Sequence, residues 1–226
     1  AKFEAGLAES LPNSVTVKSQ PEFLATLAAK AQAASTVWID PEASPTAVLL
    51  TLQNAAATPL RRPSAVTKAK AVKNAAELSG MRASHRDDGL AMTRFSEWLH
   101  REVPTRAAQC NPVTEREAEE KAQFFRSDCA GYIYDSFAPI SAAAGNAAMC
   151  HYAATEASNA PILPAQPYLL DSGGQYVNGT TDVTRSFAFG QCPEGYERAY
   201  TAVFKAFVAL ATLRFPKGTQ GHHIDA

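Results

Sequence analysis

One stretch constrains the fold of this chain more than any other: LLDSGGQYVNGTTDVTRSFAFG, at residues 169–190. Apolar and β-branched residues on both sides of a glycine-rich segment are typical of two strands that fold back as a β-hairpin. Asp171 ends the apolar part of the first strand, and Asp182 precedes Val183 in the second. A carboxylate beside such a strand is costly unless it is paired or binds a metal. The hairpin therefore predicts half of a two-metal site. Aspartates that accept backbone hydrogen bonds in turns are the alternative.

The distance between the two aspartates depends on the register of the hairpin. If Asn178 and Gly179 formed a two-residue turn, Asp182 would face Gln175. Asp171 would then lie roughly 13 Å further along the same face, at about 3.3 Å per residue. Paired catalytic metals lie about 3.5–4 Å apart. We therefore expect the Asn-Gly signal not to set the turn.

Direct opposition of the aspartates requires a register centred between Tyr176 and Val177. This register predicts a loop wider than two residues, or a β-bulge, at the tip of the hairpin. Gly173 and Gly174 are the expected bend, because glycine accommodates kinks and close backbone approach within a strand.

Length and charge exclude several classes of protein. A chain of 226 residues allows one large domain or two small ones. Because 21 Lys and Arg balance 22 Asp and Glu, the sequence predicts no nucleic-acid partner, which would require a basic surface. An apolar stretch of membrane-spanning length is missing from the sequence, so we expect no membrane association. The four cysteines form no C-x-x-C pair, which favours free thiols in the reducing cytoplasm.

Residues 1–63 are predicted to form a small α/β segment that ends at a boundary near Ser64. Pro21 suits the first turn of a helix, and turn-forming residues gather before the boundary. The expected elements are strands at 14–18 and 36–40, helices at 20–34 and 47–54, and a turn-rich linker at 59–63.

Residues 64–226 are predicted to form helices, then an antiparallel sheet, then a last helix. Apolar residues return every three or four positions from Val66 to an expected end near Pro104, as two helices or one long bent one. Thr114 is the expected N-cap of the next helix, and Glu117 would complete a capping box. The later elements expected are strands at 132–137, 149–152, 167–171 and 180–189, and a helix at 194–215. This order predicts an α+β fold with helices on one face of a curved sheet.

The motifs around the hairpin resemble one enzyme family. SFAPISAAAGNAAMCHYAA precedes the hairpin, FPKGTQGHHIDA follows it, and AKAVKNAAELSGMRASHRDDG lies further upstream. Together with the hairpin they resemble the Xaa-Pro aminopeptidases (aminopeptidase P), metallopeptidases of the pita-bread, creatinase/aminopeptidase-like fold. The resemblance is close over residues 65–226 and looser over residues 1–62. It implies that residues 64–226 are the first half of the catalytic domain, and residues 1–63 the tail of an α/β middle domain with its linker.

The resemblance also implies a role for each candidate site residue. Asp171 would bind one metal ion, Asp182 would bridge two, and His151 would contact the substrate or stabilise the transition state. The implied cofactors are two divalent ions, usually Mn²⁺, which hold a bridging hydroxide. The implied substrates are peptides with proline at the second position. Thr184 and Arg185 match residues that orient the carboxylates, although Arg185 fits a surface strand position equally well.

The chain departs from the family pattern after the hairpin. The ligand histidine and the two ligand glutamates of the family lie further downstream and have no counterpart here, and His222 matches a position without a ligand role. We therefore expect the isolated chain to be inactive, to bind metal weakly and to expose an apolar face. The chain begins without Met, and we expect a piece cut at both ends. The missing half of the domain is expected in a longer polypeptide or as a separate chain, and the intact enzyme as a homodimer.

Two other interpretations keep the fold. The first is a non-catalytic pita-bread module that binds peptides or histones; such modules typically lose the metal-binding aspartates, which this chain retains. The second is another enzyme of the superfamily, such as a prolidase, a methionine aminopeptidase or a creatinase. The form Gly179-Thr-Thr-Asp182 and the upstream partial domain resemble the long aminopeptidases P more closely.

Overall fold

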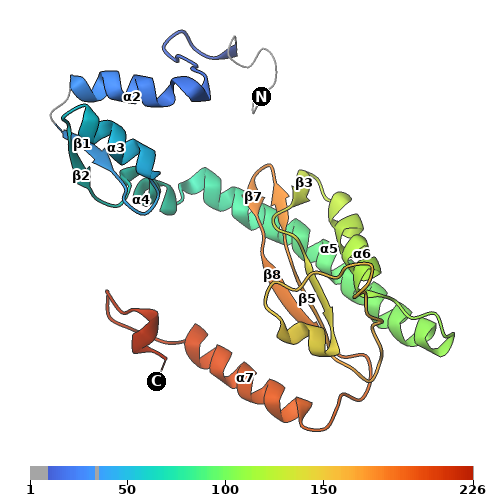
Figure 1. Cartoon of the computed structure of the whole chain (residues 1–226). Coiled ribbons are helices and arrows are strands. Elements are labelled where there is room, and N and C mark those ends of the chain that lie inside the picture. Colours follow the sequence, from blue (N-terminus) through green and yellow to red (C-terminus); the bar gives the residue numbers. More distant parts are fainter. Residues whose placement is uncertain (1–9, 34–35, 226) are drawn as a thin grey trace. The chain divides into compact units, whose positions relative to one another are not determined.

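The structure is a computed structural model that describes residues 10–33 and 36–225 (Figure 1). It divides into two compact units, Ala1–Lys73 and Asn74–Ala226. Among the described residues, no helix combines the length and the apolar content that crossing a bilayer requires. Within the same residues all four cysteines are free.

The first unit is a small α/β structure. A small core forms where α2 and α3 pack beside a parallel two-stranded sheet, with Leu52 fully buried. Its elements are η1 (Gln20–Glu22), α2 (Phe23–Gln32), β1 (Thr36–Ile39), α3 (Thr46–Asn54), β2 (Thr58–Arg61) and α4 (Ala65–Ala71).

Two predictions for this unit were wrong. The expected strand at 14–18 is irregular, and Val15 and Val17 are exposed, so the alternating pattern has no partner strand. The expected linker at 59–63 begins inside β2. Pro59 is compatible with that strand because a two-stranded sheet has only edge strands, where a missing N–H is tolerated. The end of the predicted helix at Ala34 lies outside the described residues.

Ser64, where the sequence predicts the boundary, lies at the start of α4. Ser64 caps α4 and its N–H donates to Asp40 Oδ2 at 2.8 Å, so this residue is tied to the first unit. The compact units separate between Lys73 and Asn74. The domain assignment of 1–63 and 64–226 stays a prediction for limited proteolysis to test.

Two helices build one layer of the second unit. The first, α5 (Ala75–Ala108), begins at a capping box formed by Asn74 and Glu77. The predicted end near Pro104 was wrong, because α5 continues past this residue to Ala108. The proline lacks one backbone donor, but it lies close to the end of the helix. Cys110 then takes a positive φ of 56°, the left-handed conformation common after a helix end.

The second helix, α6 (Glu115–Ser127), begins at the predicted N-cap. Thr114 Oγ1 accepts the N–H of Glu117 at 3.4 Å, which confirms the cap. The reciprocal half of the predicted capping box is replaced by an ion pair between the Glu117 carboxylate and Arg106 of α5. A charge-assisted, two-pronged contact is stronger than a backbone cap.

In the described part of the second unit, the strands form two three-stranded antiparallel sheets, β3-β6-β7 and β4-β5-β8. Both helices α5 and α6 contact these strands (Figure 1), so the predicted α+β layering is present. The elements are β3 (Tyr132–Asp135), β4 (Ile140–Ala143), η2 (Ala144–Ala148), β5 (Tyr168–Ser172), β6 (Gly174–Tyr176), β7 (Gly179–Thr180), β8 (Val183–Phe187), α7 (Tyr196–Ala211) and η3 (Gly221–His223).

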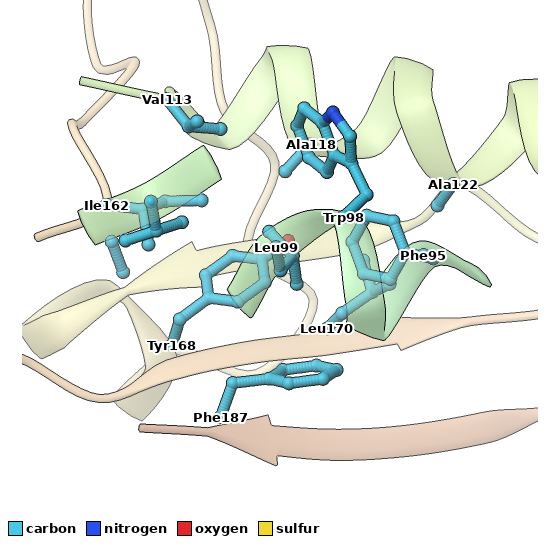
Figure 2. Close-up of a cluster of buried hydrophobic side chains, with 12 residues drawn as sticks. Phe95, Trp98, Leu99, Val113, Ala118, Ala122, Ile162, Tyr168, Leu170 and Phe187 are labelled. Carbon is cyan, nitrogen blue, oxygen red and sulfur yellow. The ribbon is translucent and has the colours of Figure 1, made fainter. Parts of the chain in front are cut away.

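The core of the second unit lies between the helices and the β4-β5-β8 sheet. Figure 2 shows aromatic and aliphatic side chains of α5 facing Tyr168, Leu170 and Phe187. The rings of Phe95 and Phe187 meet edge to face, with centroids 6.1 Å apart. Each fully buried large apolar side chain contributes roughly 1.5–3 kcal/mol. This packing fixes which side chains of β5 and β8 face the helices.

A buried ion pair joins α5 and α6 to the hairpin. Arg126 Nε donates to Asp88 Oδ1 at 2.7 Å, and both side chains are almost fully buried. The hydroxyl of Tyr176 in β6 donates to the same Oδ1 at 2.9 Å. Burial, followed by the charge of Asp88, raises the pKa of Tyr176, so the hydroxyl remains a donor. The tip of the hairpin is thereby tied to both helices.

Candidate metal centre

Asp171 lies on the middle strand of the β4-β5-β8 sheet. Its pairing partners are Ile140 of β4 and Thr184 of β8. The side chain is half-buried, and Oδ1 is shut off from solvent without a hydrogen-bond partner in the described chain. The core on one side of the sheet and the strands on both flanks therefore fix the position of this carboxylate.

Asp182 lies in the break between β7 and β8 and is exposed. Val183 pairs with Ser172, and one further step in this register places Asp182 across from Gly173. The two aspartates are therefore diagonal neighbours on the same face, with a typical Cα separation of roughly 7–8 Å. The prediction that they oppose each other directly was wrong.

The tip of the hairpin is a two-residue turn made by Val177 and Asn178. Tyr176 pairs with Gly179 across this turn, so the predicted wider loop was wrong. The expectation that Asn178 and Gly179 do not form the turn is confirmed. Gly179 instead lies against α5, where an added Cβ would come within 2.2 Å of Ser84 Oγ. The close approach of the helix accounts for this glycine.

The predicted bend in the hairpin is at Gly173. The chain leaves one sheet after Ser172 and enters the other at Gly174, which is the first residue of β6. A Cβ at Gly173 would lie 2.0 Å from the backbone oxygen of Thr181. Ser136 Oγ donates to the same oxygen at 2.8 Å. Only glycine fits at this crossing, immediately beside both aspartates.

His151 lies in a turn that follows η2, and its side chain is exposed. The predicted strand at 149–152 was wrong, because this part of the β4–β5 connection turns back on itself. The φ of His151 is 56°, in the left-handed region. A residue other than glycine pays about 1–3 kcal/mol for such a conformation, so its surroundings must hold it there.

All three predicted site residues line one pocket of about 450 Å³. Asp171 and Asp182 come from the hairpin, and His151 comes from the β4–β5 connection. The rest of the lining is mostly apolar: Phe137, Ala138, Pro139, Ile140, Tyr152 and Ala153. His151 and Asp182, which lie 31 positions apart in the sequence, are thus brought into the same pocket.

A larger hollow of about 730 Å³ lies between α5 and β8 and contains none of these three residues. His85, His100 and Arg185 line it. Arg185 is exposed, and its Nη1 donates to the backbone oxygen of Thr184 at 2.8 Å. The chemistry predicted from the sequence therefore belongs to the smaller pocket.

Comparison with known proteins assigns the chain to a family. Residues 79–226 match the model of metallopeptidase family M24. The chain belongs to family M24. The predicted resemblance and the predicted pita-bread fold are thereby confirmed.

Several known proteins are similar to the chain. A probable Xaa-Pro aminopeptidase P of Paracoccidioides lutzii is 43% identical over 162 residues, which are 72% of this chain and 26% of that protein. An X-prolyl aminopeptidase from Caenorhabditis elegans, described as a cytosolic enzyme with a di-nuclear active site, matches 93% of this chain and 34% of its own, with a TM-score of 0.82 and 33% identity. A prolidase from Thermococcus sibiricus shares the fold, with a TM-score of 0.67 and 20% identity. The match covers 91% of this chain and 54% of the prolidase. The chain spans about a quarter of the length of the curated relatives it matches.

The residues that line the pocket suit a divalent cation. Asp171 Oδ1 is a buried acceptor without a partner in the described chain, and such an atom costs about 1–3 kcal/mol if nothing satisfies it. None of the described residues that line the pocket is Lys or Arg. Two carboxylates on one face repel each other unless a cation lies between them. Their oxygens are the hard ligands that Mg²⁺, Ca²⁺ and Mn²⁺ prefer.

Few side chains of metal-binding type gather in the described part of the chain. Among residues 10–33 and 36–225, no group of three or more His, Cys, Asp and Glu side chains is arranged to hold a metal ion. His151 lines the pocket, and its side chain is exposed. The chain therefore contributes two carboxylates and a histidine to the pocket.

Glu115 and Tyr152 were not predicted as site residues. Glu115 is the first residue of α6 and is fully buried, and Tyr152 lines the pocket beside His151. Burial raises the pKa of Tyr152, and the hydrogen bond to Glu115 raises it further. The sequence gives little sign of this contact, because an acidic residue in the first turn of a helix normally serves the helix dipole.

Proposed function

We propose that this chain carries half of the metal centre of an Xaa-Pro aminopeptidase, which hydrolyses the bond between an N-terminal residue and a following proline. The observation that carries the proposal is the pocket shared by Asp171, Asp182 and His151, in which Asp171 Oδ1 is buried without a partner in the described chain. Likeness to the probable Xaa-Pro aminopeptidase P of P. lutzii and to the X-prolyl aminopeptidase of C. elegans supports the substrate class.

Asp171 and Asp182 are the proposed ligands of two divalent ions, with Mn²⁺ as the first candidate. Asp171 would bind one ion and Asp182 both, an assignment supported by their diagonal placement on one face of the hairpin. When bound, such a pair lowers the pKa of a water molecule towards neutrality and polarises the scissile carbonyl. The β4 and β8 neighbours of Asp171 hold its carboxylate in place, so little reorganisation is needed for binding.

His151 is the proposed hydrogen-bond donor to the substrate or to the oxyanion that develops during hydrolysis. Its exposed side chain in the lining of the pocket supports contact with the substrate better than metal ligation. A donor fixed in place before the reaction stabilises developing charge without the cost of reorienting solvent.

The remaining metal ligands are proposed to come from a polypeptide segment outside residues 1–226. This segment would be present in a longer polypeptide or as a separate chain, and the 226-residue chain alone would not cleave peptides. The described residues support this proposal, since they offer no group of three metal-binding side chains. We further propose a homodimeric enzyme in the cytoplasm; the cytosolic description of the C. elegans neighbour supports the location.

Cleavage of Xaa-Pro peptides by the full-length protein tests the proposal. With Mn²⁺ added, we expect release of the first residue from a tripeptide with proline second, and no release when alanine replaces that proline. Asp182→Asn should lower kcat/KM by more than about 100-fold, since loss of a ligand exceeds the 10–100-fold effect of its supporting groups. Asp128→Asn is the matched control, because Asp128 is an exposed carboxylate at the end of α6.

The outcomes separate this proposal from the alternatives. Cleavage of Xaa-Pro dipeptides alone would contradict it and favour a prolidase. Binding of peptides without cleavage, by a full-length protein loaded with Mn²⁺, would contradict it and favour a non-catalytic peptide- or histone-binding module.

A further inference from the structure

Glu115 is a fully buried carboxylate at the start of α6 that accepts four hydrogen bonds. Its Oε1 accepts from the backbone N–H of Ala143 at 2.7 Å and from Asn146 Nδ2 at 2.9 Å. Its Oε2 accepts from the Tyr152 hydroxyl at 2.8 Å and from the backbone N–H of Ala160 at 3.0 Å. Every partner is a donor, so the carboxylate is fully satisfied without a counter-charge, and the N-terminus of α6 favours it further.

All four donors belong to one segment, the connection that leaves β4 at Ala143 and returns to β5. A backbone hydrogen bond also ties the stretch before β5 to the start of α6: the N–H of Glu115 donates to the backbone oxygen of Ala160 at 3.0 Å. In the middle of the connection, Tyr152 is the side chain that reaches Glu115, and Asn146 Nδ2 also donates to the Tyr152 hydroxyl at 3.0 Å. Glu115 therefore gathers the start, the middle and the end of the connection.

His151 precedes Tyr152 directly. It is exposed, and its φ of 56° is unfavourable for a residue with a side chain. The local backbone hydrogen bond here, from Tyr152 N–H to Met149 O, is 3.3 Å long. The anchor for this conformation is thus the buried tyrosine on Glu115.

We propose that Glu115 is a positioning residue for His151: through Tyr152 it holds the β4–β5 connection so that His151 stays in the lining of the pocket that contains Asp171 and Asp182. Its catalytic consequence rests on the proposed function. Its structural consequence is an ordered β4–β5 connection, and this consequence does not depend on the proposed function.

Hydrogen exchange tests the structural part without activity. In the full-length protein, Tyr152→Phe should speed exchange of the Met149 and Tyr152 amides by about tenfold, because a hydrogen bond to a buried charged group is lost. Tyr132→Phe is the matched control: its hydroxyl donates to the Asp135 carboxylate at 2.8 Å, but outside the connection. Equal exchange in both variants would overturn the proposal.

A double-mutant cycle tests the catalytic part. Tyr152→Phe should lower kcat/KM by about tenfold, because the contact of His151 with the substrate or with the developing oxyanion is displaced. In a His151→Ala background the same change should have no further effect, since the two residues act in series. Glu115→Gln replaces one carboxylate oxygen with an NH₂ group, a donor that would face the donors now bound to Glu115. It should lower activity as much as Tyr152→Phe or more. An undiminished loss in the His151→Ala background would overturn the positioning role.

The two readouts separate the proposals. If the unmutated full-length protein cleaved no Xaa-Pro peptide, the proposed function would fail, and the exchange experiment alone would decide the role of Glu115. If cleavage were normal but exchange in Tyr152→Phe matched that in Tyr132→Phe, the role of Glu115 would fail and the proposed function would stand.

Discussion

Two residues of the candidate site occupy positions that cost free energy unless something compensates. Asp171 Oδ1 is a buried acceptor without a partner in the described chain, at a cost of about 1–3 kcal/mol. His151 has a left-handed backbone, at a similar cost. A bound cation would offset the first cost. The buried network on Glu115 offsets the second by holding the neighbouring Tyr152.

Alkaline pH provides a residue-scale prediction. Burial, followed by the hydrogen bond to Asp135, raises the pKa of Tyr132 from 10.0 to about 12. The fold therefore favours the neutral hydroxyl, and this stabilisation is complete below pH 10 and is lost as the pH rises from 10 to about 12. We expect the free energy of unfolding, measured by urea denaturation, to fall across that window. The fall should be shallower in Tyr132→Phe; an equally steep fall would contradict the assignment.

Asp171, Asp182 and His151 could be singled out from the sequence because each lies in a distinctive motif, and they line one pocket. Their roles stay predictions. The geometry between the aspartates could not be predicted, because the hairpin register depends on how α5 packs against Gly179. Glu115 was missed for a related reason. One of its four donors, Ala160, lies 45 residues away, and nothing in the local sequence indicates that contact.

At the scale of elements, α5 approaches the hairpin through glycines on both sides. An added Cβ at Gly80 of α5 would lie 2.3 Å from the backbone oxygen of Asn178, and one at Gly179 would lie 2.2 Å from Ser84 Oγ. The close packing of α5 fixes the tip of the hairpin, and the hydrophobic core fixes its other end, at β5 and β8. The aspartates lie between these two supports.

A pair of substitutions in α5 tests this packing. Gly80→Ala should destabilise the protein by about 1–3 kcal/mol, because the new methyl group collides with backbone. Gly89→Ala should stabilise it by roughly 0.5–1 kcal/mol, since a Cβ there meets nothing within 4 Å and alanine is the better helix former. Thermal or urea denaturation measures both. Equal effects of the two changes would contradict the close packing of α5 on the hairpin.

Elements with strong local signals could be predicted, and those that depend on distant contacts could not. The N-cap at Thr114 follows from the residue type and was confirmed. The strand expected at 149–152 fails because Glu115 draws this segment into a compact connection. The expected helix end near Pro104 fails because the missing N–H of a proline removes one backbone hydrogen bond but does not have to end the helix, and α5 continues to Ala108.

At the scale of the whole molecule, α7 is an amphipathic helix with none of its described residues buried. Val203, Phe204, Phe207 and Leu210 are between 54% and 69% exposed. An apolar face of this kind is typical of an interface or of a surface that a further segment covers. This agrees with a chain that spans about a quarter of the length of its curated relatives.

The exposed face predicts self-association of the isolated 226-residue chain. We expect its sedimentation coefficient to rise with concentration. Phe207→Glu should weaken this rise, because it places a charge in the apolar face, whereas Lys205→Glu introduces the same side chain off that face and should not. A chain that stayed monomeric at every concentration would contradict the prediction.

Asp171 and Asp182 are proposed to be ligands of a pair of metal ions. The most direct test is the metal content of the full-length protein after loading with Mn²⁺ and removal of the excess, measured by elemental mass spectrometry. We predict about two ions per chain in the unmutated full-length protein. The metal content should fall substantially in both Asp171→Asn and Asp182→Asn and should not change in Asp128→Asn. Full metal content in both aspartate variants at the hairpin would contradict the account.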